Sequence, residues 1–351
     1  MIWLTLRQFR VQGAVVFGTL AVLCAALAAT GPGLADDYDR GAASCGTRDS
    51  CTHFARMFFN DHQVYYGALI ALVLFLPALI GTFWGAPLIT RELENGTHRL
   101  VWNQSVTRTR WLAVKLGLLG LAAMLAAGIA VLAANWWSGP LDEAVTSRFP
   151  RIGPVAFDTH GIVPIGHAAF AFALGVTAGV LTRRTLPAMA ATLAVFAAVQ
   201  VAMPLWVRPH LIPPTTGSVA ITAENISQMT LDHGAGVMRV QTEAAPGSWT
   251  LANHTVDASG REARLPASLM TGACAPPRVE PEPKPDGGGL PPGGPSDECF
   301  AEIARLGFRQ HVVYQPADRF WRLQWVETGL FAVLTLGLTG LCFSWTRRRL
   351  S

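Results

Sequence analysis

Residues 112–136 read LAVKLGLLGLAAMLAAGIAVLAANW and are apolar at almost every position. The single charged side chain in this run, Lys115, lies close to its start. A helix needs about 20 consecutive apolar residues to cross the hydrocarbon core of a bilayer. The stretch is long enough to do so, and it therefore predicts a membrane-spanning helix.

Five further runs have the same character, at Val11–Thr30, Gly67–Ile89, Ile165–Thr182, Leu186–Val207 and Leu323–Trp345. The composition of the 351-residue chain agrees, since 51% of residues are hydrophobic and only 14% are charged, against about 25% charged in soluble domains. Pro77 and Pro187 do not exclude helices here, because membrane helices tolerate proline. We predict an all-α polytopic membrane protein with six transmembrane helices.

The basic side chains predict the orientation of these helices. If the N-terminus is cytoplasmic, the short inner segments carry twelve of the 27 Lys and Arg residues, namely Arg7, Arg10, Arg91, Arg99, Arg108, Arg110, Lys115, Arg183, Arg184, Arg347, Arg348 and Arg349. The other basic residues are spread over much longer outer segments. The positive-inside rule then places both termini in the cytoplasm. The first apolar run, Val11–Thr30, could instead be a cleaved secretory signal. It is longer than the apolar core of such a signal, so we expect a retained helix.

The outer segments are residues 31–66, 137–164 and 208–322, and the last predicts a small α+β extracytoplasmic domain between helices 5 and 6. Its expected elements are strands at Val237–Thr242, Trp249–Val256 and His311–Tyr314, and a helix at Asp297–Leu306 that Asp297 caps and Gly307 stops. Residues 276–295 are rich in Pro and Gly and predict no regular structure. Asp318 is expected to cap the entry to the last helix, and residues 323–351 to form that helix and a basic cytoplasmic tail.

Cysteine usage fits this placement. Cys24 and Cys342 lie in predicted spans, whereas Cys45, Cys51, Cys274 and Cys299 lie outside them. Pairs that are local in sequence favour the disulfides Cys45–Cys51 and Cys274–Cys299, with free or rearranged thiols as the alternative. A zinc site at Cys45, Cys51 and His53 matches no standard spacing, so no metal is expected.

The inner loop after the second span, residues 90–111, reads TRELENGTHRLVWNQSVTRTRW. It holds the only two acidic residues predicted to lie inside, Glu92 and Glu94, among several basic and aromatic side chains. Such a segment suits a short helix on the membrane surface whose charges face a cytoplasmic partner. An ordinary charged hairpin loop that only fixes orientation explains the same residues, and composition alone does not choose between them.

The pattern in this loop resembles the inner loop of ABC-2 type permeases. The matching residues are Glu92-Leu-Glu94-Asn-Gly96-Thr97, then Leu100, Ser105, Arg108 and Lys115. The resemblance implies a coupling helix that docks on a separate ATP-binding cassette subunit, with Arg91, Glu92, Glu94, Gly96, Thr97, Arg99, Ser105, Arg108 and Lys115 at the contact. Residues 1–10 are similar to the amphipathic interfacial helix of that family, with Trp3, Leu6 and Phe9 facing lipid. The chain departs from the family at Leu93, where Arg is usual, and in the long segment 208–322.

No Gly-x-x-x-x-Gly-Lys-Ser/Thr motif is present in the sequence, so ATP and Mg are expected on the partner subunit and no cofactor on this chain. Six spans make half of a transport path in this family, which implies a second copy or a homologue. Small residues four apart, at Gly81 and Gly85 and at Gly175 and Gly179, predict close helix packing, within the chain or at a dimer face. No basic run suited to nucleic acid occurs.

Few polar residues lie in the spans, and His167, Gln200 and Glu327 are the notable ones. Glu327 is expected to reach the outer headgroups, or else to face a cleft with Gln200 and bind a cationic part of a substrate. The sequence thus predicts the permease subunit of an ATP-driven exporter of a hydrophobic or amphipathic substrate, working by alternating access. The abundance of Ala and Arg indicates a bacterial plasma membrane. A membrane-anchored sensor or immunity protein is the alternative, and an intramembrane enzyme lacks its His-Glu-x-x-His signature.

Overall fold

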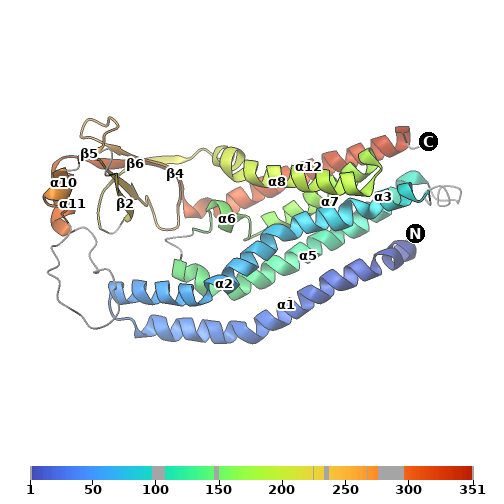
Figure 1. The fold of residues 1–351 in the computed structure, drawn as a ribbon, viewed down its shortest axis with the longest axis horizontal. Coiled ribbons are helices and arrows are strands. Elements are labelled where there is room, and N and C mark those ends of the chain that lie inside the picture. Colours follow the sequence, from blue (N-terminus) through green and yellow to red (C-terminus); the bar gives the residue numbers. More distant parts are fainter. Residues whose placement is uncertain are drawn as a thin grey trace. The chain divides into compact units, whose positions relative to one another are not determined.

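The computed structural model describes residues 2–96, 107–145, 150–223, 225–232, 237–266, 268–275 and 296–349. The chain divides into two compact units. One is helical and comprises Met1–Ile212 with Asp318–Ser351, and the other contains the strands and comprises Pro213–Ala317 (Figure 1). The chain therefore leaves the helical unit once and returns to it once.

The described part of the helical unit contains six stretches that are long and apolar enough to cross a membrane, as the sequence predicted. They are Thr5–Ser44, Ser50–Glu94, Thr109–Ala144, Val163–Thr182, Thr185–Leu211 and Ala317–Arg348. The elements that form them are α1 (Ile2–Ser44), α2 (Arg48–Ile80), the π-helix η1 (Gly81–Gly85), α3 (Pro87–Glu94), α5 (Arg108–Val145), α7 (Val163–Thr182), α8 (Thr185–Ala202), the π-helix η2 (Met203–Val207), α9 (Arg208–Leu211), the 3-10 helix η3 (Ala317–Arg319) and α12 (Phe320–Arg349). A single short turn, α6 (Pro154–Phe157), precedes α7.

Helices α1 and α2 are much longer than their apolar runs. The 43 residues of α1 extend about 65 Å, roughly twice the thickness of a hydrocarbon core. Residues 31–66, expected as an outer segment, are thus mostly a helical hairpin. A disulfide between Cys45 and Cys51 closes its tip, and the stacked rings of Tyr38, Phe54 and Phe58 hold its two arms together.

Helix α7 lies in the middle of the helical unit and packs against α2, η1, α5, α8 and α12. Most of its side chains are buried, and nearly all of them are small or apolar on every face of the helix. This is the pattern of a helix surrounded by other helices. Helix α1 begins and α12 ends at the same end of the unit (Figure 1), and we call this the terminal end. An even number of spans places both there.

The second unit consists of two three-stranded antiparallel sheets with strand orders β1-β6-β4 and β2-β3-β5. Its elements are β1 (Thr215–Ala220), β2 (Ile226–Asp232), β3 (Val237–Thr242), β4 (Trp249–Val256), β5 (Leu265–Pro266), α10 (Ser268–Thr271), α11 (Asp297–Arg305) and β6 (Arg309–Gln315). The predictions of β3, β4 and the helix are confirmed, and β6 extends the predicted third strand. The cap of α11 is Ser296 rather than Asp297, because the Ser296 hydroxyl accepts from the Cys299 N–H. The expected disulfide Cys274–Cys299 lies in the apolar core beside Met238.

The start of α1 corrects one prediction. Residues 2–10 are helical, but they continue into the spanning part of α1 without a break. Trp3 and Leu6 are exposed as expected, whereas Phe9 is buried and its ring centre lies 4.6 Å from that of Trp84. Residues three apart differ by about 60° around a helix, so Phe9 lies about 120° from Trp3 and packs on Trp84 while Trp3 stays exposed.

Candidate functional site

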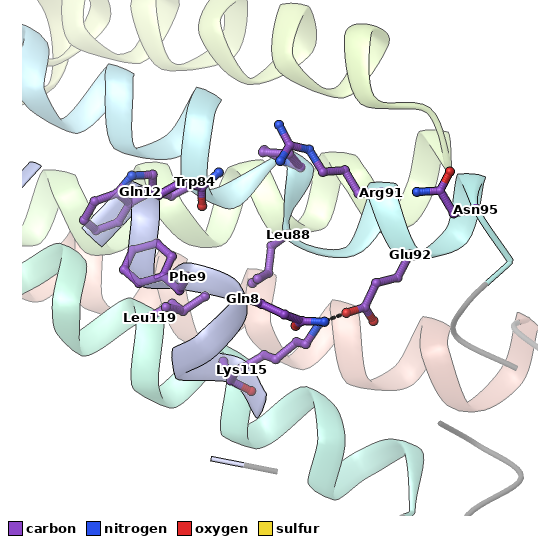
Figure 2. Close-up of a pocket in the computed structure, with 12 residues that line it drawn as sticks. Gln8, Phe9, Gln12, Trp84, Leu88, Arg91, Glu92, Asn95, Lys115 and Leu119 are labelled. Carbon is purple, nitrogen blue, oxygen red and sulfur yellow. Dashed lines mark hydrogen bonds and ion pairs between the residues drawn. The ribbon is translucent and has the colours of Figure 1, made fainter. Parts of the chain in front are cut away.

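The last turn of α3 is bound to α5 by an ion pair. Glu92 accepts a hydrogen bond from the ammonium of Lys115, and the Lys115 Nζ also lies 4.8 Å from the centre of the Trp111 ring (Figure 2). The Lys115 side chain is 5% exposed and that of Glu92 is 14% exposed. Such a pair fixes the position of α3 against α5, because separating the two would leave a charge in an apolar setting.

The same turn of α3 is bound to the first turn of α8. The Glu94 carboxylate accepts from the Thr185 backbone N–H at 2.7 Å and from the Thr185 hydroxyl at 2.8 Å. That hydroxyl is also 2.9 Å from the hydroxyl of Thr90. A carboxylate at a helix N-terminus satisfies a free N–H and interacts favourably with the helix dipole. Helix α3 is thus linked to the ends of two other spans.

A pocket of about 310 Å³ opens between the start of α1, the segment from η1 to α3, and α5 (Figure 2). Gln8, Arg91 and Lys115 contribute polar groups to its wall, and Trp84 and Leu119 contribute apolar ones. In Figure 2 the Arg91 guanidinium points away from the Glu92–Lys115 pair. Arg91 is exposed, so its charge is available at the surface.

The other residues predicted for docking are only partly placed. Gly96 has a φ of +68°, which ends α3 in a left-handed turn that glycine adopts readily. Arg108 is the first residue of α5. Thr97, Arg99 and Ser105 lie outside the described residues. Of these residues, the structure pairs Glu92 with Lys115 and places Glu94 against Thr185, in two separate contacts within the chain.

The four glycines predicted for helix packing contact one another inside the chain. A Cβ atom on Gly175 would lie 2.2 Å from the Gly81 carbonyl oxygen, and one on Gly179 would lie 2.8 Å from the Ala86 carbonyl oxygen. A Cβ on Gly85 would meet the Phe172 carbonyl oxygen at 2.6 Å. Helix α7 thus touches the backbone of η1 directly. The close contact uses both glycine pairs, so they form an intramolecular seam between α7 and the segment from η1 to α3.

At the opposite end of the helical unit, Arg208 is completely buried in an ionic cluster. Its guanidinium donates two hydrogen bonds to Glu327, at 2.8 and 2.9 Å, and another to Asp158. It also donates to the Pro154 carbonyl at 3.1 Å and lies over the Phe157 ring at 4.3 Å. Arg208 and Glu327 both have 0% exposed surface. The cluster ties α9 to α12 and α6.

This cluster corrects the expectation for Glu327. Its carboxylate is fully buried and accepts two hydrogen bonds from Arg208 of the same chain, so Arg208 takes the place of the expected cationic partner. His167 is buried beside it, with Nε2 3.8 Å from the Glu327 Oε1. The amide of Gln200 has neither atom hydrogen-bonded in the described structure, and Gln200 is not part of this cluster. The sequence interpretation placed Arg208 in the outer segment, and it did not single out Asp158.

A lone acidic residue in an apolar run is the signal that could have revealed this arrangement. A buried carboxylate is unfavourable without a positive partner, and Arg208 ends the fifth apolar run, next to Pro209. Asp158, His167 and Glu327 do place ligand-type atoms within 4.8 Å of one another. The Arg208 guanidinium faces both carboxylates, however, and a positive side chain there disfavours a metal ion.

The six apolar helices define a multi-pass membrane protein. Helix α3, at the end of the second span, contacts the third span through Glu92 and the fifth through Glu94. A family model described as ABC-2 membrane transporter related matches residues 17–208. The match covers more than half of the chain, and the chain belongs to this family of membrane transporters. Permeases of the ABC-2 type generally work with a separate ATP-binding subunit. No curated protein matches the chain, and no solved structure does.

Proposed function

We propose that this chain is the permease subunit of an ATP-driven exporter in a bacterial plasma membrane, with both termini in the cytoplasm. The observation that carries this proposal is the position of α3. It directly precedes the loop that resembles a coupling helix, and its last turn is bound to α5 through Glu92 and to α8 through Glu94. A displacement of this loop would therefore act directly on three spans, namely the one that ends in α3 and those formed by α5 and α8.

The proposed mechanism is alternating access. An ATP-binding cassette subunit, which holds ATP and Mg, docks on residues 90–111 of each of two permease chains. When ATP closes the two cassette subunits, α3 moves, and the Glu92–Lys115 and Glu94–Thr185 contacts move α5 and α8 with it. Ionic and capping contacts can transmit such displacements because they hold their partners in a defined geometry. The α7–η1 glycine seam keeps the end of α2 against the central helix during this movement.

The second unit supports a different function, in which an outer ligand-binding domain serves a sensor or immunity protein. Pro213–Ala317 has its own apolar core, with Met238, Leu265 and Ile303 almost fully buried, and its own disulfide. A domain with a separate core keeps its shape without contacts to a bundle. The two functions differ in whether an ATPase binds the chain.

The test is affinity purification of the full chain in mild detergent, followed by mass spectrometry of the proteins that co-elute. Arg99→Glu reverses a charge in the loop, and Arg56→Glu, the matched control, reverses an exposed charge on the distant half of α2. We expect an ATP-binding subunit with the wild-type chain and with Arg56→Glu, and much less of it with Arg99→Glu. Absence of any ATPase after crosslinking would reject the permease proposal in favour of the sensor.

A further inference from the structure

The pocket between α1, α3 and α5 is not accounted for by docking or by coupling. We propose that it binds the phosphate headgroup of an anionic glycerophospholipid of the membrane leaflet at the terminal end. This inference goes beyond the proposed transport function; it depends on the proposed orientation, with the terminal end in the cytoplasm, and not on transport or on an ATPase. It rests on the charge of the pocket, on the order of its polar and apolar walls, and on the lipid-facing surface beside it.

The first argument is charge. The lining residues include two cations, Arg91 and Lys115, and one anion, Glu92, so the wall has a formal charge of +1. Lys115 is paired with Glu92, so the exposed guanidinium of Arg91 is the cation of this wall that is available to an added anion. A guanidinium binds phosphate oxygens through two parallel hydrogen bonds. A phosphodiester with one negative charge balances this wall.

The second argument is the order of groups along the pocket. Gln8 and Lys115 are nearer the terminal end of α1 and α5, while Gln12 and Leu119 lie further along the same two helices, and Asn95 after α3 is likewise nearer that end than Trp84 of η1 (Figure 2). Amide N–H groups donate to phosphate and ester oxygens, and the rings of Trp84 and Phe9 provide an apolar floor. A molecule with a charged head and an apolar body matches this order, whereas a small soluble anion would use only one half of it.

The third argument is the surface that adjoins the pocket. Helix α1 exposes Leu6, Val11 and Val15 at 50% or more on the same helix that contributes Gln8 and Gln12. Acyl chains of a bound lipid would lie along such a face, since the hydrophobic effect favours covering it. Basic pockets between membrane helices near the cytoplasmic leaflet are known to bind anionic headgroups, and the proposed orientation places this pocket there.

The test uses the full chain without any ATPase subunit, delipidated in detergent. Native mass spectrometry and melting temperature are measured with phosphatidylglycerol, with phosphatidylcholine of the same acyl chains, and with glycerol 3-phosphate. We expect one tightly bound phosphatidylglycerol, with an apparent affinity about tenfold higher than that of phosphatidylcholine, because the choline cation of the latter offsets the attraction of its phosphate to the positive wall. Glycerol 3-phosphate is expected to leave the melting temperature unchanged.

Arg91→Gln is expected to remove this preference for phosphatidylglycerol, Arg91→Lys to keep part of it, and Arg56→Gln, the control, to keep all of it. Arg91 is exposed, so the lipid-free Arg91→Gln chain is expected to melt like the wild type, which separates loss of binding from loss of fold. Equal binding of both lipids to the wild type would overturn the proposal. So would an equal effect of Arg56→Gln, and glycerol 3-phosphate binding as tightly as the lipid would reassign the site to a soluble anion.

Discussion

The two ends of the helical unit use charged side chains in opposite ways. At the terminal end, Glu92 keeps 14% of its side-chain surface exposed, Glu94 is exposed, and Arg91 lines an open pocket. At the other end, Arg208 and Glu327 are fully buried and the guanidinium donates to two carboxylates and a carbonyl. The Glu92–Lys115 pair retains some access to water, whereas opening the fully buried cluster would leave charges with no access to water and no partner. The terminal end thus presents charges at its surface, whereas the opposite end uses its charges to join helices.

Arg208→Met is the change with the largest expected effect. It leaves Asp158 and Glu327 buried without a positive partner, so we expect the free energy of unfolding to fall by about 3–5 kcal/mol. The measurement is unfolding of the detergent-solubilised chain by denaturant, with Arg56→Met as the control. If Arg208→Met unfolds at the same denaturant concentration as its control, the cluster does not hold this end.

Lys115→Met is expected to have an intermediate effect. Glu92 loses its ammonium partner but retains some access to water, so we expect a loss of about 1–3 kcal/mol. Unfolding of the two single variants and of the double variant Glu92→Gln with Lys115→Met forms a double-mutant cycle. Strictly additive losses would show that the pair contributes no coupling between α3 and α5.

Glu94→Ala is expected to have the smallest effect on stability and a larger one on function. The Glu94 carboxylate is at the surface, so we expect the melting temperature of the chain to stay close to that of the control Asp61→Ala. In a complex with the proposed ATP-binding subunit, stimulation of ATP hydrolysis by this chain is expected to fall by a factor of about ten, within the range of coupling energies between sites. Unchanged stimulation would mean that movement of α3 does not pass through α8.

The spans and much of the second unit followed from the sequence because their signals are local. An apolar run of 18 or more residues crosses a bilayer whatever its neighbours are, and β3 and β4 coincide with the stretches rich in β-branched residues. The expected partners of Cys45 and Cys274 are the ones found in the structure, since each lies within a short segment. The sequence did not predict where α1 ends and α2 begins. Polar residues beyond each apolar run stay helical because the two helices pack against each other there.

The sequence alone also determined the membrane class of this protein and pointed to the loop after α3. Only the tertiary structure decided which partner each charged side chain in the spans has. Glu327 pairs with Arg208, which is 119 residues away in the sequence, and Lys115 pairs with Glu92, which is 23 residues away. Gly175 meets Gly81 because α7 crosses η1. A charge in an apolar run requires a partner, but its identity depends on how the helices pack, and that packing is a property of the whole fold.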